Sequence, residues 1–146
     1  MFTAARLIAA LCLAILAWLG ADYVMRLMPE RDHFGMFAYT SVVIGFLCGW
    51  IIVGPRAGRG SAAAISHGVT GVVVAILWAL FLHATNEMVD LAMRHRYDGA
   101  LEAFAAIFEI AVEYGTLLLD TGFMMLMVIG ALVTGLLPEL ASRHWR

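Results

Sequence analysis

Four acidic residues lie on one face of the longest hydrophobic segment, and their spacing suggests a chemical site. They are Glu102, Glu109, Glu113 and Asp120, separated by 7, 4 and 7 residues. At about 100° per residue, all four side chains point within roughly 20° of one direction on an α-helix. A carboxylate inside a bilayer is costly and usually functional. This acidic stripe is therefore a candidate site for protons or cations.

A histidine, Glu87 and two of these carboxylates could also form a metal site. His83 and Glu87 are four residues apart on the preceding hydrophobic segment, as are Glu109 and Glu113 on the last one. Because residues four apart share a helix face, one nitrogen and three oxygens could surround a metal ion. A hydrogen bond between His83 and a carboxylate is the simpler alternative. The Glu-x-x-His spacing of di-iron bundles is absent, so that particular site is not predicted.

The glycine-rich sequence 54–60 offers a different chemistry. Four of its seven residues are Gly or Pro, which cannot hold a helix, and Arg56 and Arg59 lie among them. Exposed backbone N–H groups and two guanidinium groups could bind a phosphate or another oxyanion. The sequence lacks a Walker or dinucleotide fingerprint, so no nucleotide site is predicted. A turn whose arginines lie near lipid phosphates is the simpler interpretation.

The composition is that of an integral membrane protein. The 146-residue chain is 63% hydrophobic and only 14% charged, with a mean hydropathy of +0.90. A soluble domain is nearer half apolar and a quarter charged. The net charge is −2 and no basic run occurs, which argues against nucleic-acid binding. No serine or cysteine stands in a nucleophile motif, so neither catalytic residues nor a cofactor is predicted, and we expect a non-enzymatic protein.

Four hydrophobic segments are long enough to span a bilayer. They cover roughly residues 3–28, 34–53, 62–85 and 100–137, and residues 86–99 form a polar, interfacial connection. Short connections predict an all-α, antiparallel four-helix bundle in one domain, residues 1–146. As one helix, the fourth segment would be about 57 Å long, so it should protrude partly from the membrane. Gly45 and Gly49 have the GxxxG spacing that allows a neighbouring helix to approach closely.

The length of the fourth segment changes the interpretation of the acidic stripe. Counting about 20 residues back from Leu137 places the membrane boundary near Leu118. Asp120 then lies just inside the membrane, whereas the three glutamates lie at or beyond its surface. We therefore expect an outward-facing polar cluster that includes Asp120, Glu102, Arg94 and Arg96. Its simplest form is an acidic face that meets water or pairs with the arginines of that side, Arg26, Arg31, Arg94 and Arg96.

The charge distribution predicts an orientation. With four spans, both termini lie on the same side as the sequence 54–60. That side carries five arginines and one acid, and the opposite side carries four arginines and ten acids. Arginines near helix ends favour the cytoplasmic side, so both termini are predicted to be cytoplasmic.

Six short stretches are distributed along essentially the whole chain: 3–7, 27–30, 53–60, 86–88, 94–99 and 108–110. Together they resemble the TrgA family of small bacterial inner-membrane proteins. The resemblance implies a multi-pass protein of the bacterial inner membrane that is associated with tellurite resistance. It carries over no catalytic motif, so it names a phenotype without a mechanism.

Three functions are compatible with these observations. The first is a non-enzymatic accessory or structural component, in contact with lipid and with other membrane subunits or a second copy of the chain. The second is a proton- or cation-coupled carrier that uses the acidic stripe; ionised carboxylates would repel a tellurite dianion. The third is a metal-dependent membrane enzyme built on His83, Glu87, Glu109 and Glu113.

Overall fold

The computed structural model describes residues 4–28 and 36–144, and all regular structure within these ranges is helical. The prediction of an all-α chain is therefore confirmed. The elements are α1 (Ala4–Leu27), α2 (Phe37–Cys48), η1 (Gly49–Val53), η2 (Gly54–Arg56), α3 (Ser61–Met93), α4 (Ala100–Leu118) and α5 (Thr121–His144). The π-turn η1 and the 3-10 turn η2 continue α2 without a break.

Four helical stretches in the described residues are long and apolar enough to cross a membrane. They are α1, the continuous stretch Phe37–Arg56, α3 and α5. The first three overlap most of the predicted segments 3–28, 34–53 and 62–85; residues 3, 34 and 35 lie outside the described residues. Large apolar side chains are exposed along all four stretches, for example Ile15, Val43, Leu77 and Ile129.

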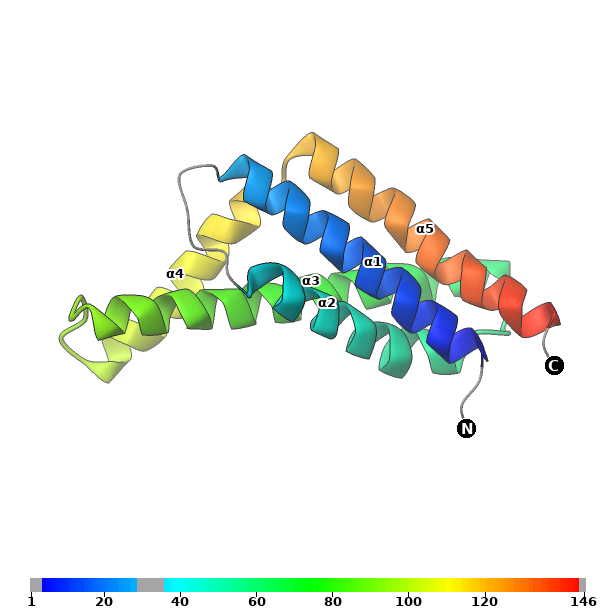
Figure 1. The fold of residues 1–146 in the computed structure, drawn as a ribbon, viewed down its shortest axis with the longest axis horizontal. Helices are drawn as coiled ribbons and strands as arrows, with labels where there is room; N and C mark the ends of the chain where they lie inside the picture. The colour runs from blue at the N-terminus through cyan, green and yellow to red at the C-terminus, as the bar shows by residue number, and fades with distance from the viewer. Residues whose placement is uncertain (1–3, 29–35, 145–146) are drawn as a thin grey trace.

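The four apolar stretches pack side by side around a common core (Figure 1). α1 contacts α2 and α5, while α3 contacts α2 and α5 from the other side. The described ends of α1 and α5, Ala4 and His144, lie at the same end of the molecule (Figure 1). The core is filled by large side chains from all four, including Leu13, Leu16, Ile44, Val72, Phe123 and Met127.

Glycines allow these helices to approach backbone to backbone. A Cβ atom on Gly49 would lie 2.6 Å from the Cα atom of Ala10, and one on Gly45 would lie 2.6 Å from the carbonyl oxygen of Leu13. Such contacts are too short for any side chain at these positions. The close approach predicted from the GxxxG spacing is thus confirmed, and its partner is α1.

The single long helix predicted over residues 100–137 is corrected by the structure, which divides it into α4 and α5. α4 ends in a tight turn in which the N–H of Asp120 donates to the carbonyl of Leu117 at 3.3 Å. The Asp120 carboxylate then accepts the N–H groups of Gly122 and Phe123 at 3.1 and 3.4 Å. An aspartate that satisfies the first free N–H groups of a helix is a capping residue, so it starts α5.

α5 also continues beyond the predicted end at residue 137. It passes through Pro138 and reaches His144. Proline removes one backbone hydrogen bond but does not always end a helix in a packed apolar bundle. The extension places Glu139 within α5, where it takes part in a contact described below.

α3 and α4 form a hairpin that projects beyond the other helices (Figure 1). α3 has 33 residues, whereas α1 and α5 have 24 each. At 1.5 Å per residue these lengths are about 50 Å and about 36 Å. Residues 86–93 of the predicted connection form the last turns of α3. The hairpin has its own small core of Ala84, Ile107, Ile110 and Tyr114.

Candidate functional site

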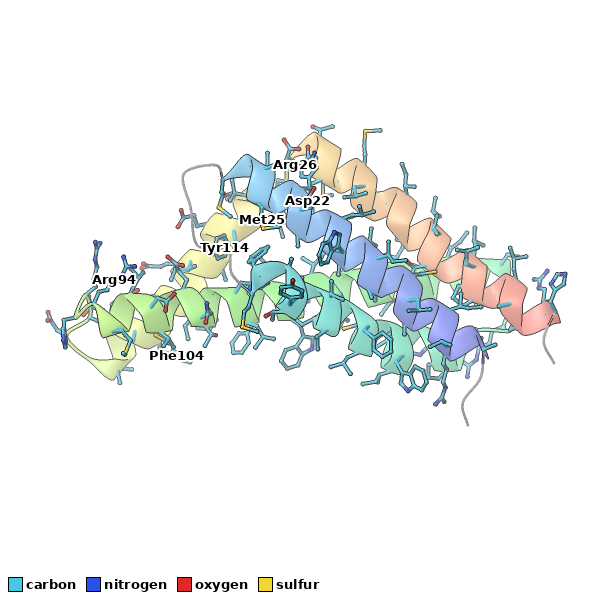
Figure 2. All side chains as sticks on the ribbon, viewed as in Figure 1. Asp22, Met25, Arg26, Arg94, Phe104 and Tyr114 are labelled. Atoms are coloured by element: carbon cyan, nitrogen blue, oxygen red, sulfur yellow. The ribbon has the colours of Figure 1, made fainter. Side chains whose placement is uncertain are left out.

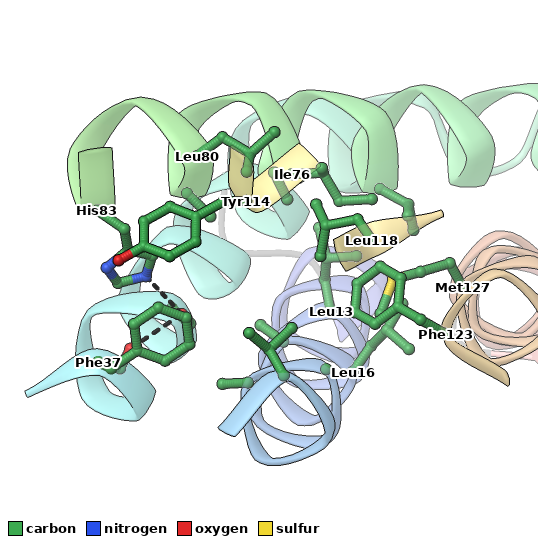
Figure 3. Close-up of a pocket in the computed structure, with 18 residues that line it drawn as sticks. Leu13, Leu16, Phe37, Ile76, Leu80, His83, Tyr114, Leu118, Phe123 and Met127 are labelled. Carbon is green, nitrogen blue, oxygen red and sulfur yellow. Dashed lines mark hydrogen bonds between the residues drawn. The ribbon is translucent and has the colours of Figure 1, made fainter. Parts of the chain in front are cut away.

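An apolar cavity of about 80 Å³ lies where all five α-helices meet, and we take it as the candidate site. Leu13, Leu16, Phe123 and Met127 line one part of it. The polar lining groups gather elsewhere, around His83 (Figure 3). A mostly apolar cavity with a few convergent polar groups is the usual form of a small-molecule site. The residues that line it include no Asp, Glu or Arg, so the cavity suits an uncharged group.

The polar end of the cavity is held by a hydrogen-bonded chain from α2 to α3. The Ser41 hydroxyl donates to the carbonyl of Phe37 at 2.9 Å, and its oxygen lies 3.0 Å from Nε2 of His83. A hydroxyl has one proton, so Nε2 of His83 must be the donor in the second bond. The Phe37 ring stacks on the imidazole, with 3.9 Å between ring centroids and 24° between planes. His83 is therefore fixed in one orientation at the cavity wall.

Ser41 and Tyr114 were not among the residues singled out from the sequence. Both line the cavity together with His83, and Figure 3 shows the Tyr114 ring at the same end as His83. Their sequence signal was a hydroxyl group within an apolar segment. Away from water, such a hydroxyl needs a hydrogen-bond partner from the protein. That signal does not say which residue is the partner.

The four metal-ligand candidates are divided between different surroundings. His83 lines the cavity, whereas Glu109 and Glu113 are exposed on α4. α4 turns Ile110 and Tyr114 toward α3, and the glutamates therefore lie on another face of the helix. In the described ranges, no group of three or more His, Cys, Asp or Glu side chains could hold a metal ion. Glu87 on α3 thus forms no such group with them.

The predicted polar cluster is spread along the hairpin. Arg94 is exposed near its tip (Figure 2), and Arg96 is exposed two residues further along the connection between α3 and α4. Glu102 lies close to this turn, where it accepts the N–H of Asp98 at 3.0 Å. Asp120 lies at the opposite end of α4, about 27 Å away by helical rise. Two other predicted members are also accounted for: Arg26 pairs with Asp22 at 2.8 Å, and Arg31 lies outside the described residues.

Asp120 joins α1 to the start of α5. The Tyr23 hydroxyl donates to Oδ2 of Asp120 at 2.5 Å, in addition to the two backbone N–H groups of the cap. The hydrogen bond from Tyr23 is the main cause that lowers the pKa of Asp120 below its usual value, and the backbone donors add to it. The residue predicted to lie within the membrane therefore sits at a helix junction between α4 and α5.

Removing the Tyr23 hydroxyl is expected to weaken the acid dependence of stability. A lowered pKa in the folded state means that ionised Asp120 stabilises the fold above its unfolded pKa of about 4, and that this contribution is lost as the pH falls through the folded pKa. Tyr23→Phe should therefore lose less stability than the wild type between about pH 5 and pH 3. The unfolding midpoint in detergent across this range measures the effect. Asp120→Asn should flatten the profile further, and parallel profiles for Tyr23→Phe and wild type would contradict the assignment.

Another polar contact that was not predicted from the sequence involves Glu139, near the C-terminal end of α5. Glu139 is only 3% exposed. Its carboxylate accepts the backbone N–H groups of Gly58 at 2.6 Å and Gly60 at 3.1 Å, and Arg143 donates to it at 3.3 Å. Arg143 also reaches the hydroxyl of Ser61 at 3.4 Å. We call this contact the Glu139 clasp, because it ties α5 to the connection before α3.

The clasp gives the predicted anion-binding backbone an internal partner. Gly58 and Gly60 have φ angles of +93° and +107°, which glycine adopts readily and which help turn both N–H groups toward one anion. That anion is the Glu139 carboxylate. Arg56 and Arg59 are exposed in the same connection, and their contact with an external oxyanion stays a prediction. The sequence signal for the clasp was a lone acid in an apolar helix at the arginine-rich end.

The chain was compared with protein-family models, with curated proteins and with solved structures, and none of the three comparisons finds a match. The class of protein is therefore defined by its own structure: the regular structure of the described residues is all helical, and it includes four helical stretches long and apolar enough to cross a membrane.

Proposed function

We propose that this protein is an antiparallel four-span bundle of the bacterial inner membrane and that it acts as a non-enzymatic component of tellurite tolerance. The observation that best supports a structural role is the use of its interior polar groups. Asp120 joins α1 to α5, Ser41 and His83 join α2 to α3, and Glu139 joins α5 to the α2–α3 connection. Each of these groups is hydrogen-bonded across two elements.

The outer surface supports membrane insertion. Apolar side chains are exposed along the four apolar stretches, as lipid-facing residues are in a helical bundle. Such a surface in water would be an extensive apolar patch, far beyond what soluble monomers expose. The resemblance to the TrgA family supports the inner membrane as the location and tellurite tolerance as the phenotype.

The clustering of arginines supports cytoplasmic termini. Arg6 packs against Gly54, and Arg143 takes part in the Glu139 clasp, so both lie at the end that carries Arg56 and Arg59. The hairpin at the opposite end carries most of the acids. Arginines concentrate on the cytoplasmic side of membrane proteins. A green fluorescent protein fused to the C-terminus should therefore fluoresce, whereas an alkaline phosphatase fused there should be inactive; the reverse pattern would overturn the orientation.

Deletion of the gene is expected to lower tellurite tolerance several-fold, and the wild-type gene should restore it. The carrier alternative is tested in the same strain with Glu109→Gln/Glu113→Gln. A structural component should tolerate the loss of two exposed charges, so this variant should also restore growth. Failure of the double variant alone, at equal membrane abundance, would favour the carrier. Unchanged tellurite tolerance after deletion would disprove the proposed phenotype.

A further inference from the structure

We propose that the outward face of α4 is a docking surface for a partner protein that presents an apolar groove bordered by Lys or Arg. This inference rests on the proposed membrane placement, because that placement puts the face in water. The surface consists of Leu101, Phe104, Phe108 and Val112, which we call the outer stripe, and of an acidic ridge beside it formed by Glu102, Glu109 and Glu113.

α4 has two apolar faces, and only one of them is covered. The inner face packs on α3 through Ala106, Ile107, Ile110 and Tyr114. The residues of the outer stripe recur at intervals of three and four, so they share one helix face. At about 100° per residue, this face lies roughly opposite the inner face. Its side chains are 87%, 59%, 58% and 67% exposed in chain order. In the part of the chain that the structure describes, no helix packs on this stripe.

The centre of the outer stripe is already organised. The rings of Phe104 and Phe108 pack edge to face, with 5.3 Å between centroids and 74° between planes. Aromatic side chains four residues apart on one helix face are the usual anchors of a helix that lies in an apolar groove. Because the two rings restrain each other, binding would cost less side-chain entropy than for isolated side chains.

The hairpin geometry places most of the stripe beyond the hydrocarbon layer. α1 and α5 are each about 36 Å long, which is enough for a core of about 30 Å, whereas α3 continues about 14 Å further. The last turn of α4 lies at the level of the cavity, where Leu118 lines it. Phe108 and Leu101 precede Leu118 by about 15 and about 25 Å along the helix. These side chains therefore meet water unless another molecule covers them.

The charge of the acidic ridge favours a partner with a basic surface. Residues 86–113 contain six acids against Arg94 and Arg96, a net charge of −4. The ridge lies about 100° around α4 from the stripe, so any surface that covers the stripe also meets the carboxylates. A second copy would carry the same negatively charged hairpin, so the two hairpins would repel each other, and an anionic lipid surface would also be repelled. A groove with a basic border satisfies both the stripe and the ridge.

The test places a photo-crosslinking amino acid at Phe108 in the full-length protein in living cells. The same amino acid at Leu77, which is exposed on the apolar part of α3, is the matched control. We expect position 108 to crosslink to a second protein, and the crosslinked peptide, mapped by mass spectrometry, should be apolar with adjacent Lys or Arg. In the background Glu102→Lys/Glu109→Lys/Glu113→Lys this product should fall several-fold, and position 77 should not form it.

Several results would overturn the proposal. These are no crosslink at position 108, a crosslink to lipid or to a second copy of the chain, or a protein crosslink that the charge reversal leaves unchanged. Membrane fractionation and the C-terminal fusions are applied to the same variants. A variant that is correctly inserted but gives one of these results disproves the docking surface alone, whereas a wild-type chain that fails to insert disproves the proposed membrane placement.

Discussion

Replacing Gly68 with leucine is expected to separate α3 from α5 and to be among the most destabilising single substitutions in the bundle. A Cβ atom at Gly68 would overlap the carbonyl oxygen of Ala131 and lie 2.9 Å from the backbone N and Cα atoms of Gly135. These are backbone atoms, so they cannot rotate away as a side chain could. Overpacking usually costs about 1–3 kcal/mol, and we expect a value at or above the upper end of this range.

The measurement is the unfolding midpoint in detergent, together with the yield of monodisperse protein. Gly115→Leu is the matched control, because apart from its chain neighbours and its own helix backbone no atom lies within 4 Å of a Cβ at that position. The same chemical change there should cause little loss and should favour the helix, since glycine is a poor helix former. Equal losses for the two variants would show that the contact between α3 and α5 is looser than the structure indicates.

The second large effect is expected from Glu139→Ala. The substitution removes the acceptor of the Gly58 and Gly60 N–H groups and leaves Arg143 without its carboxylate. Arg143 is half exposed, so the loss comes mainly from the hydrogen bonds to the charged carboxylate, which contribute about 1.5–3 kcal/mol. We therefore expect a clearly lower unfolding midpoint and faster proteolysis of the connection between η2 and α3, because α5 no longer holds it.

Two further variants separate the backbone contacts of the Glu139 clasp from its ion pair. Glu139→Gln keeps one acceptor oxygen and should have an intermediate effect. Arg143→Ala should have the smallest effect, because the Arg143 side chain is 54% exposed and such ion pairs contribute at most about 1 kcal/mol. If Arg143→Ala were as damaging as Glu139→Ala, the ion pair and not the backbone donors would hold the clasp.

Helical class and the first three apolar stretches could be predicted because they depend on neighbouring residues. A run of about 20 apolar residues is long enough to span a bilayer, whatever it packs against. The glycine spacing at Gly45 and Gly49 is also local, and it predicted a close helix contact. It did not identify α1 as the partner, because many small-residue faces are compatible with one another.

The division of residues 100–137 was missed although its signal is local. Asp120, Thr121 and Gly122 can start a helix, but the uninterrupted hydropathy of the segment favoured a single long one. Once the segment is divided, the four acids no longer lie on one helix, because Asp120 falls between α4 and α5. Asp120 becomes a cap that binds Tyr23, and the three glutamates become exposed residues of a hairpin. The turn between α4 and α5 thus changes the interpretation of the four acids, which had been the strongest candidates for a functional site.

The sequence by itself determined that this is an apolar, helical chain, where its first three apolar stretches lie, and which end carries the arginines. Only the tertiary structure decided what each polar group does. Tyr23 and Asp120 are 97 residues apart in sequence, Gly58 and Glu139 are 81 apart, and Ser41 and His83 are 42 apart. Periodicity and hydropathy report on residues within a few turns, whereas a polar group inside an apolar bundle is satisfied by whatever donor or acceptor the packing brings near.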